Sequence, residues 1–176
     1  MACWKNLRKP GYVPDRAQLD ARRLAGVLNR VFLAEPLGKG IAHLRFAGST
    51  LASIAGTDLR GLPLCCLFSA EARETLAEVV ECVAADRRLA TLVLTLDRCC
   101  VQPVAQLLLL PLTDGPEKRL VLGCLGSNLV PPGSRFRILR RIAELPVVPR
   151  TSASETVGIG ATPSRRYLKL VHCSDE

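Results

Sequence analysis

The sequence has 176 residues, of which 48% are hydrophobic and 23% are charged, and its formal net charge is +8. This length is ordinary for one domain with a single core. The positive charge lies at the two ends, since residues 1–30 carry seven Lys or Arg against two Asp, and residues 135–176 carry eight against four acids. The middle is close to neutral, which argues against a folded body that itself clamps nucleic acid.

The eight cysteines do not indicate a small, disulfide-stapled secreted protein. Most of them lie in apolar runs, where a free cysteine behaves as a small hydrophobic residue. No segment combines a charged start, an apolar stretch and a small-residue cleavage site, so no secretory signal is expected. We therefore expect reduced thiols and a cytoplasmic protein.

The first 17 residues contain Pro10 and Pro14, which break regular structure, and predict an irregular lead segment. Trp4, the single tryptophan, is expected to anchor this segment by burying its ring. A helix is predicted over Gln18–Leu33, because apolar residues recur there at helical spacing. This helix is the natural cover for one face of a sheet.

A turn is predicted at Gly38-Lys39-Gly40, a strand over residues 42–47, and a second short strand or turn over residues 48–51. Short helical pieces punctuated by glycine and proline follow over residues 53–63. A clear helix is then predicted over residues 70–86, with a serine cap and acids in its first turn.

Three antiparallel strands are predicted next, over Thr91–Asp97, Val104–Leu112 and Arg119–Leu125. The second contains four consecutive leucines, Leu107–Leu110. A strand with one wet face would alternate apolar and polar residues, so this run predicts a central strand covered on both faces. The two predicted helices are the expected covers, one behind the sheet and one in front.

A basic amphipathic segment is predicted over residues 131–145. Residues 135–145 fit a small helix, although the start, Arg135-Phe136-Arg137-Ile138, also alternates as a strand would. Residues 146–176 are expected to be a linker and an unstructured tail, because Pro, Ser, Thr and Gly dominate the first part. The folded domain is thus expected over residues 1–130.

The order of these elements resembles the PAS domain, an antiparallel sheet of strand order 2-1-5-4-3 with short helices and one longer helix. Short motifs are more narrowly similar to stand-alone PAS-type proteins of alphaproteobacteria, and they span roughly residues 4–130. These motifs are Trp4, Leu7-Arg8, Pro14-Asp15-Arg16, Leu19-Asp20, Val31-Phe32-Leu33, Ala47-Gly48-Ser49-Thr50, Gly56, Asp58-Leu59, Gly61 and Leu109-Leu110-Pro111-Leu112.

The resemblance implies an α+β fold with a five-stranded antiparallel sheet, an N-terminal covering helix and a longer helix on the other face. It also implies a sensory or regulatory module rather than an enzyme, and it supplies no catalytic residues. If a small ligand binds between sheet and long helix, its chemistry would be anionic, because guanidinium binds carboxylate or phosphate bidentately. The candidate pocket residues are Arg45, Thr50, Arg98 and Gln106.

The sequence does not favour metal, haem, flavin or acid–base chemistry. The pairs Cys65-Cys66 and Cys99-Cys100 are adjacent, whereas zinc ligands usually stand two to four residues apart, so no metal site is predicted. Haem lacks a suitable axial ligand on the long helix, and the reactive-cysteine pattern of light-sensing flavin domains is absent. The acids of the 70–86 helix have no accompanying nucleophile or base, so they are interpreted as a solvated face.

The basic flanks are the remaining candidates for an interaction surface. They predict contact with a protein partner in a signalling pathway, and the alternative is a scaffold that binds nucleic acid or an anionic membrane surface. Aromatic residues make up only 4% of the chain, which leaves little for base stacking. A homodimer through the N-terminal helix is a further possibility. The candidate interaction residues are Trp4, Arg16, Arg22, Arg137 and Arg141.

Overall fold

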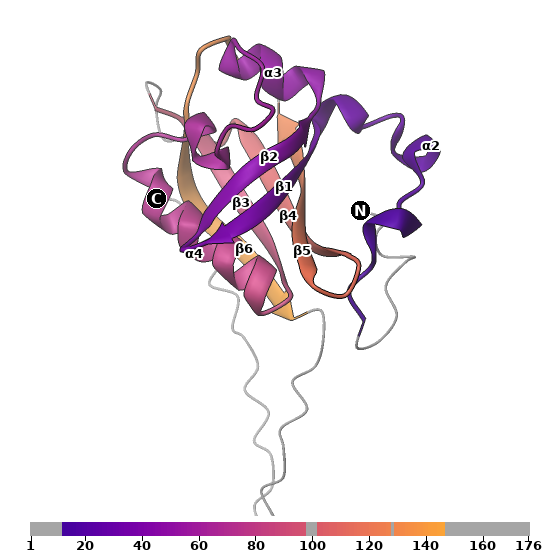
Figure 1. Cartoon of the computed structure of the whole chain (residues 1–176). Helices are drawn as coiled ribbons and strands as arrows, with labels where there is room; N and C mark the ends of the chain where they lie inside the picture. The colour runs from indigo at the N-terminus through magenta and orange to yellow at the C-terminus, as the bar shows by residue number, and fades with distance from the viewer. Residues whose placement is uncertain (1–11, 98–101, 128, 147–176) are drawn as a thin grey trace, which may run out of the picture.

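The computed structural model describes residues 12–97, 102–127 and 129–146. The chain forms an antiparallel sheet with one long helix packed across one face (Figure 1). The strands are β1 (Val31–Gly38), β2 (Ile41–Ala47), β3 (Arg88–Leu96), β4 (Ala105–Asp114), β5 (Lys118–Ser127) and β6 (Phe136–Pro146). The α-helices are α2 (Ala21–Leu24), α3 (Ser49–Ala55) and α4 (Ala72–Ala85), and short 3₁₀ turns lie at Arg16–Gln18, Leu28–Arg30 and Leu64–Leu67.

The strand order is β2-β1-β5-β4-β3-β6, and every neighbouring pair is antiparallel. The predicted α+β class is therefore confirmed, and the first five strands follow the order 2-1-5-4-3. The predicted strand count is wrong by one, because β6 adds a sixth strand beside β3.

The helix predicted over residues 135–145 is the strand β6. Its first residue, Phe136, is 1% exposed and stacks at a tilt against Phe68, with the ring centroids 6.1 Å apart. Ile138 pairs with Leu94 of β3 and packs on the same core. In a strand these alternating residues both face the core, whereas in a short helix they would point in different directions. The burial gained by the strand explains why β6 forms instead of a helix. The folded body thus extends beyond the domain end expected at residue 130.

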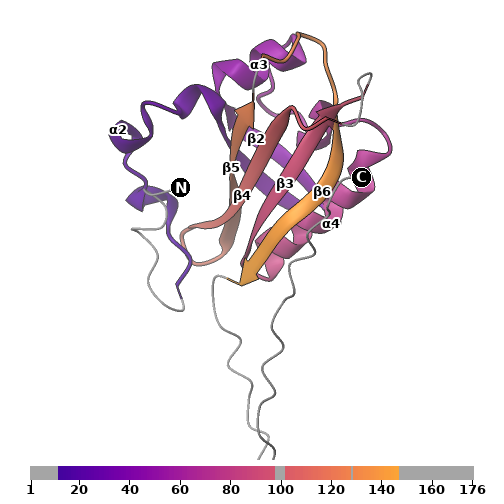
Figure 2. The same cartoon turned by 180° about the vertical axis from the view of Figure 1, so that it is seen from behind.

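The long N-terminal helix predicted over Gln18–Leu33 is also wrong. Residues 31–33, which were the last residues of the predicted helix, begin β1 instead. They are buried against β5, where Val31 pairs with Cys124. Among the described residues before them, α2 and two 3₁₀ turns form, and these lie beside the sheet rather than across its face (Figures 1 and 2). The homodimer contact expected through that helix stays a prediction. In such a dimer, α2 and the two 3₁₀ turns would have to make the contact.

The front face of the sheet is covered by α4, close to the predicted residues 70–86. The helix presents a buried stripe to the sheet, made by Ala72, Leu76, Val79, Val80, Val83 and Ala84. The sheet backbone comes unusually near its neighbours at two glycines. A side chain at Gly123 would collide with the Phe32 ring, and one at Gly40 would collide with Ala77 of α4.

The leucine run of β4 is buried from both faces, as predicted for a central strand. Leu107 and Leu109 lie in the core beneath α4, whereas Leu108 and Leu110 belong to a second cluster on the back face. Among the described residues outside the sheet, Val13 of the lead segment and Leu19, two residues after that segment, join that second cluster. The lead segment therefore supplies the described part of the rear cover that a long helix was expected to provide.

The turn predicted at Gly38-Lys39-Gly40 is confirmed, and one predicted element is reassigned. Gly38-Lys39-Gly40 forms the β1–β2 turn with positive φ at all three residues, and Gly115, also at positive φ, lies in the β4–β5 turn. The segment over residues 48–51, predicted as a strand or turn, begins α3 instead.

Candidate functional site

Most of the space between the sheet and α4, where a ligand was expected, is filled by side chains, and a pocket of about 280 Å³ lies at its edge between α4 and the start of β2. Three phenylalanines are almost fully buried there, and leucines from every layer pack around them. Protein interiors packed at this density leave little free volume. The interior of this domain is a hydrophobic core, so the polar candidates for a site must lie on the surface.

The four candidate pocket residues do not lie together. Arg45 is exposed on β2, where its Nε donates to the Glu35 carboxylate. Gln106 is exposed on β4, and Thr50 is partly buried in α3. Arg98 lies outside the described residues. The structure therefore does not bring the described three into one pocket.

Arg45 belongs to a small ion-pair cluster instead. Glu35 contacts Arg45 and, at 3.3 Å, Nζ of Lys118 on β5. The hydrogen bond from Arg45, assisted by Lys118, holds the pKa of Glu35 below its usual value. This cluster fastens β2, β1 and β5 together at their surface, which is a structural role.

The interaction candidates are spread over two regions. Arg16 contacts Asp114 at 3.7 Å and thereby joins the lead segment to the β4–β5 turn, and Arg22 is exposed on α2. Arg137 and Arg141 both lie on β6, while Trp4 lies outside the described residues. The structure thus groups two of the candidates on the edge strand.

The arginines of β6 face opposite sides of the sheet. Arg141 reaches α4, where Nη2 lies 2.6 Å from the Glu78 carboxylate and 3.3 Å from the Thr75 carbonyl oxygen. Arg137 and Arg140 pair across the strands with Thr95 and Val93. Their partners alternate with Leu92 and Leu94 of the core, so these two arginines lie on the face away from α4.

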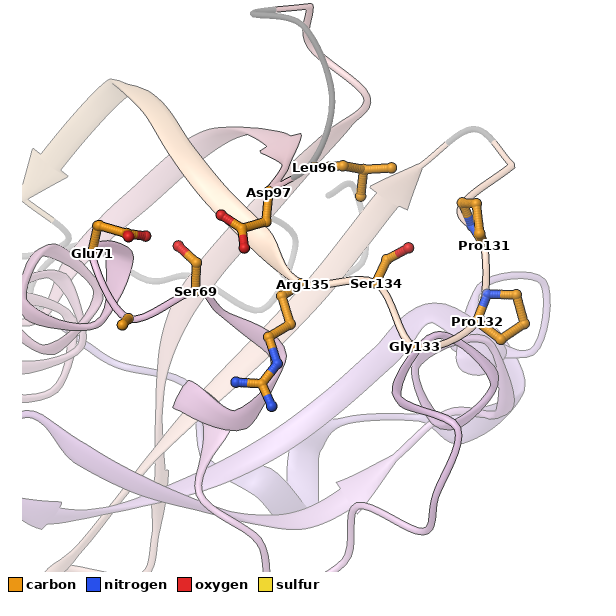
Figure 3. Close-up of a pocket in the computed structure, with 10 residues that line it drawn as sticks. Ser69, Glu71, Leu96, Asp97, Pro131, Pro132, Gly133, Ser134 and Arg135 are labelled. Carbon is orange, nitrogen blue, oxygen red and sulfur yellow. The ribbon is translucent and has the colours of Figure 1, made fainter.

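A surface pocket of about 660 Å³ lies where α4, β3 and β6 meet. Figure 3 shows Ser69 and Glu71 before α4, Asp97 after β3, and Arg135 before β6, all around this pocket. These residues are distant in sequence, and none was singled out from it as a site residue. The serine before this helix was predicted to be its cap, which is wrong, because Glu71 is the residue before α4 and no described side chain caps the helix. That predicted cap is the one local signal that could have pointed to this pocket.

Among the described cysteines, the half-buried thiols of Cys66 and Cys124 carry no sign of nucleophilic chemistry. Burial raises the pKa of Cys66, assisted by the neighbouring Cys65, and burial also raises the pKa of Cys124. Reactive cysteines show the opposite shift. Within the described part of the chain, no three His, Cys, Asp or Glu side chains are grouped so that they could hold a metal ion. None of the described helices is both long and apolar enough to cross a membrane.

Comparison with known proteins places the fold in a family. The family described as PAS domain matches residues 1–126 of this chain. No curated protein and no solved structure matches it. The match covers the lead segment, α2 to α4 and the first five strands, and it ends before β6.

Proposed function

Because the chain belongs to the PAS domain family, whose domains are generally sensory or regulatory modules, we propose that it is a non-enzymatic regulatory module that acts by contact with another protein. The observation that carries the proposal is the edge strand β6, which lies beyond the family match and presents basic and apolar side chains to solvent. We call the exposed residues Arg137, Arg140 and Ile142 the β6 surface.

The composition of the β6 surface suits a protein partner. Ile142 is 50% exposed, and it lies at an irregularity of the strand, between the pairs formed by Arg141 and Ala143. Arginine and exposed aliphatic side chains are typical of the contact residues in protein interfaces. Because both of its charges are positive, the β6 surface is complementary to an acidic patch on the partner.

Side chains, rather than strand addition, are expected to make this contact. The pairing of β6 with β3 is interrupted by two register shifts, which bend and twist the edge. Twisted, bulged and arginine-rich edges resist pairing with another strand. The filled interior supports the same proposal, since a signal would pass through the surface rather than through a ligand enclosed in the core.

A photo-cross-linking residue at position 142 tests the proposal, with position 41 as the matched control. Ile41 and Ile142 are both isoleucines on edge strands, and they are 49% and 50% exposed. We expect position 142, and not position 41, to cross-link to one acidic protein in cells. Cross-linking at both positions alike would contradict a specific surface.

Charge reversal identifies the contact with purified components. The double variant R137E/R140E should weaken binding of the cross-linked protein by about tenfold or more, because reversing two charges at an interface turns attraction into repulsion. The control R60E/R119E changes the same charge at two other exposed arginines and should leave the affinity unchanged. Equal weakening by both doubles would reduce the effect to net charge and overturn the proposed surface.

The salt dependence of binding distinguishes the proposed function from the alternative, which is binding to nucleic acid or to an anionic membrane. Duplex DNA and vesicles containing anionic lipid would bind the parent protein with steep salt dependence if the basic residues served that role. If R137E/R140E abolishes such binding and no protein cross-links to position 142, the contact is with a polyanion and the proposal is wrong.

A further inference from the structure

The pocket where α4, β3 and β6 meet contains the buried hydroxyl group of Ser69. Ser69 is 3% exposed, and its backbone N–H donates to the Phe136 carbonyl at 2.9 Å. Its Oγ forms no hydrogen bond of acceptable geometry with the described part of the chain. The Glu71 carboxylate is nevertheless near enough for the hydroxyl to help lower its pKa, after the effect of the backbone N–H of Glu71 itself.

An unsatisfied buried hydroxyl is uncommon, because its desolvation costs about 1–3 kcal/mol when no hydrogen bond replaces water. In Figure 3 the Ser69 oxygen is directed toward the space between the carboxylates of Glu71 and Asp97. All three residues line the same pocket. The hydroxyl is therefore positioned to bind a molecule that enters between them.

Two negative charges flank this hydroxyl. Glu71 and Asp97 are exposed at the mouth of the pocket, and no described ion pair contains either one, although the charge of Arg137 contributes to the lowered pKa of Glu71. Two carboxylates that share a site repel one another, and a cation between them relieves the repulsion. Figure 3 shows the side chain of Arg135 directed away from Asp97, so this guanidinium does not occupy the position between the acids.

From this arrangement we propose that the pocket binds a small molecule through its primary ammonium group. An ammonium has three N–H donors and no acceptor, as the lysine side chain shows. The pocket offers three acceptors from separate residues, which are the Ser69 hydroxyl and the carboxylates of Glu71 and Asp97. A pocket of about 660 Å³ has room for a small organic amine.

A divalent metal ion and an anion fit this donor set less well. Hard cations such as calcium take six to eight oxygen ligands, whereas the side chains of this pocket offer two carboxylates and the hydroxyls of Ser69 and Ser134. An anion is favoured near the N-terminus of a helix such as α4, but here it would meet both carboxylates. The inference depends on this pocket alone and stands independently of the proposed protein partner.

Titration of the full chain with 1,4-diaminobutane, followed by the backbone amide signals in NMR, tests the inference. We expect saturable shifts at Ser69, Glu71 and Asp97. Tetramethylammonium is the matched control ligand, because it has the same charge on nitrogen and no N–H donor. It should shift these signals weakly and without saturation.

Variants of the acceptors identify the binding mode. S69A and D97N should each weaken the binding of 1,4-diaminobutane by about tenfold or more, which is the effect of losing one hydrogen bond to a charged group. S69A removes one oxygen from a buried position, and D97N preserves the shape of an exposed side chain. The control D86N removes an exposed carboxylate at the other end of α4 and should leave the affinity unchanged.

Three results would overturn the inference. The first is equal binding of tetramethylammonium, which would show unspecific attraction to acidic side chains. The second is full retention of binding in both S69A and D97N. The third is the lack of saturable shifts with the diamine. If calcium or magnesium then produces saturable shifts at these residues, the pocket binds a metal ion instead of an amine.

Discussion

The Asp15 carboxylate in the lead segment accepts a hydrogen bond at 2.9 Å from the backbone N–H of Gly115, one hundred residues further along the chain. The same oxygen, Oδ2, accepts from the Thr113 hydroxyl at 3.2 Å, and Oδ1 accepts from the Ala17 N–H at 2.9 Å. The Thr113 N–H in turn donates to the Pro14 carbonyl at 3.1 Å. These bonds fasten the lead segment to the β4–β5 turn.

This fastening should loosen in acid. The hydrogen bonds from the N–H groups of Ala17 and Gly115, with that of Thr113, hold the pKa of Asp15 below its ordinary value of 3.8. A carboxyl with a lowered folded pKa stabilises the fold above the ordinary value, and the contribution disappears as the pH falls through the folded pKa. We therefore expect the Gly115 amide to lose protection from hydrogen exchange as the pH drops below about 4.

Replacing the carboxylate tests the same contact at neutral pH. In D15N the Gly115 amide should exchange faster, because an uncharged acceptor binds a backbone N–H more weakly. E117Q, which removes an exposed charge from the same turn, is the control and should leave the exchange rate unchanged. Unaltered exchange in D15N would show that the carboxylate does not hold the segment.

Gly123 should tolerate no side chain. Its position on β5 faces the Phe32 ring so closely that a methyl group would overlap it, and overpacking of this kind costs about 1–3 kcal/mol. In urea unfolding G123A should be destabilised by that amount. Gly126 lies on the same strand, where the nearest atom to an added Cβ would be the Gln106 carbonyl oxygen at 3.8 Å, so G126A should change stability by less than about 0.5 kcal/mol.

Alanine substitutions in the β1–β2 turn test whether the turn packs against α4. Gly38 and Gly40 both have positive φ, at 94° and 71°, so an alanine strains the backbone at either position. Only at Gly40 would the methyl group also collide with Ala77. G40A should therefore unfold at a lower denaturant concentration than G38A, and equal midpoints would show that the turn does not pack on the helix.

Phe136 should be the main energetic contribution of β6 to the core. Because it is 1% exposed and contacts Phe68, F136A should cost about 3–5 kcal/mol in denaturant unfolding. I142A, on the same strand at 50% exposure, should cost less than about 0.5 kcal/mol. Similar costs for both variants would contradict the observed orientation of β6.

Arg141 and Glu78 should be coupled only weakly. Their ion pair joins β6 to α4, but its side chains are 32% and 61% exposed, and exposed pairs contribute about 0.2–1 kcal/mol. A double-mutant cycle with R141Q and E78Q should give a coupling energy in that range that decreases with salt. A larger, salt-independent value would indicate a buried pair.

Sequence alone determined the elements whose signal is local. The four leucines of β4 predicted a strand buried on both faces, and the structure places alternate leucines in two separate clusters. The amphipathic stretch of α4 and the glycine turns were likewise readable, because periodicity and positive φ depend on neighbouring residues. The short motifs resembling the PAS domain were enough to anticipate the family.

Tertiary structure decided the rest. Val31 has helical spacing with Val27 and Leu28, yet its pairing with β5, about ninety residues away, makes it part of a strand. The local sequence around Phe136 is compatible with a helix or a strand. Contacts with Phe68 and β3 bury its side chain and select the strand. The candidate amine pocket likewise needs Ser69 and Glu71, which precede α4, beside Asp97, which follows β3. Contacts between distant segments, which outweigh local propensity, are what a single sequence does not display.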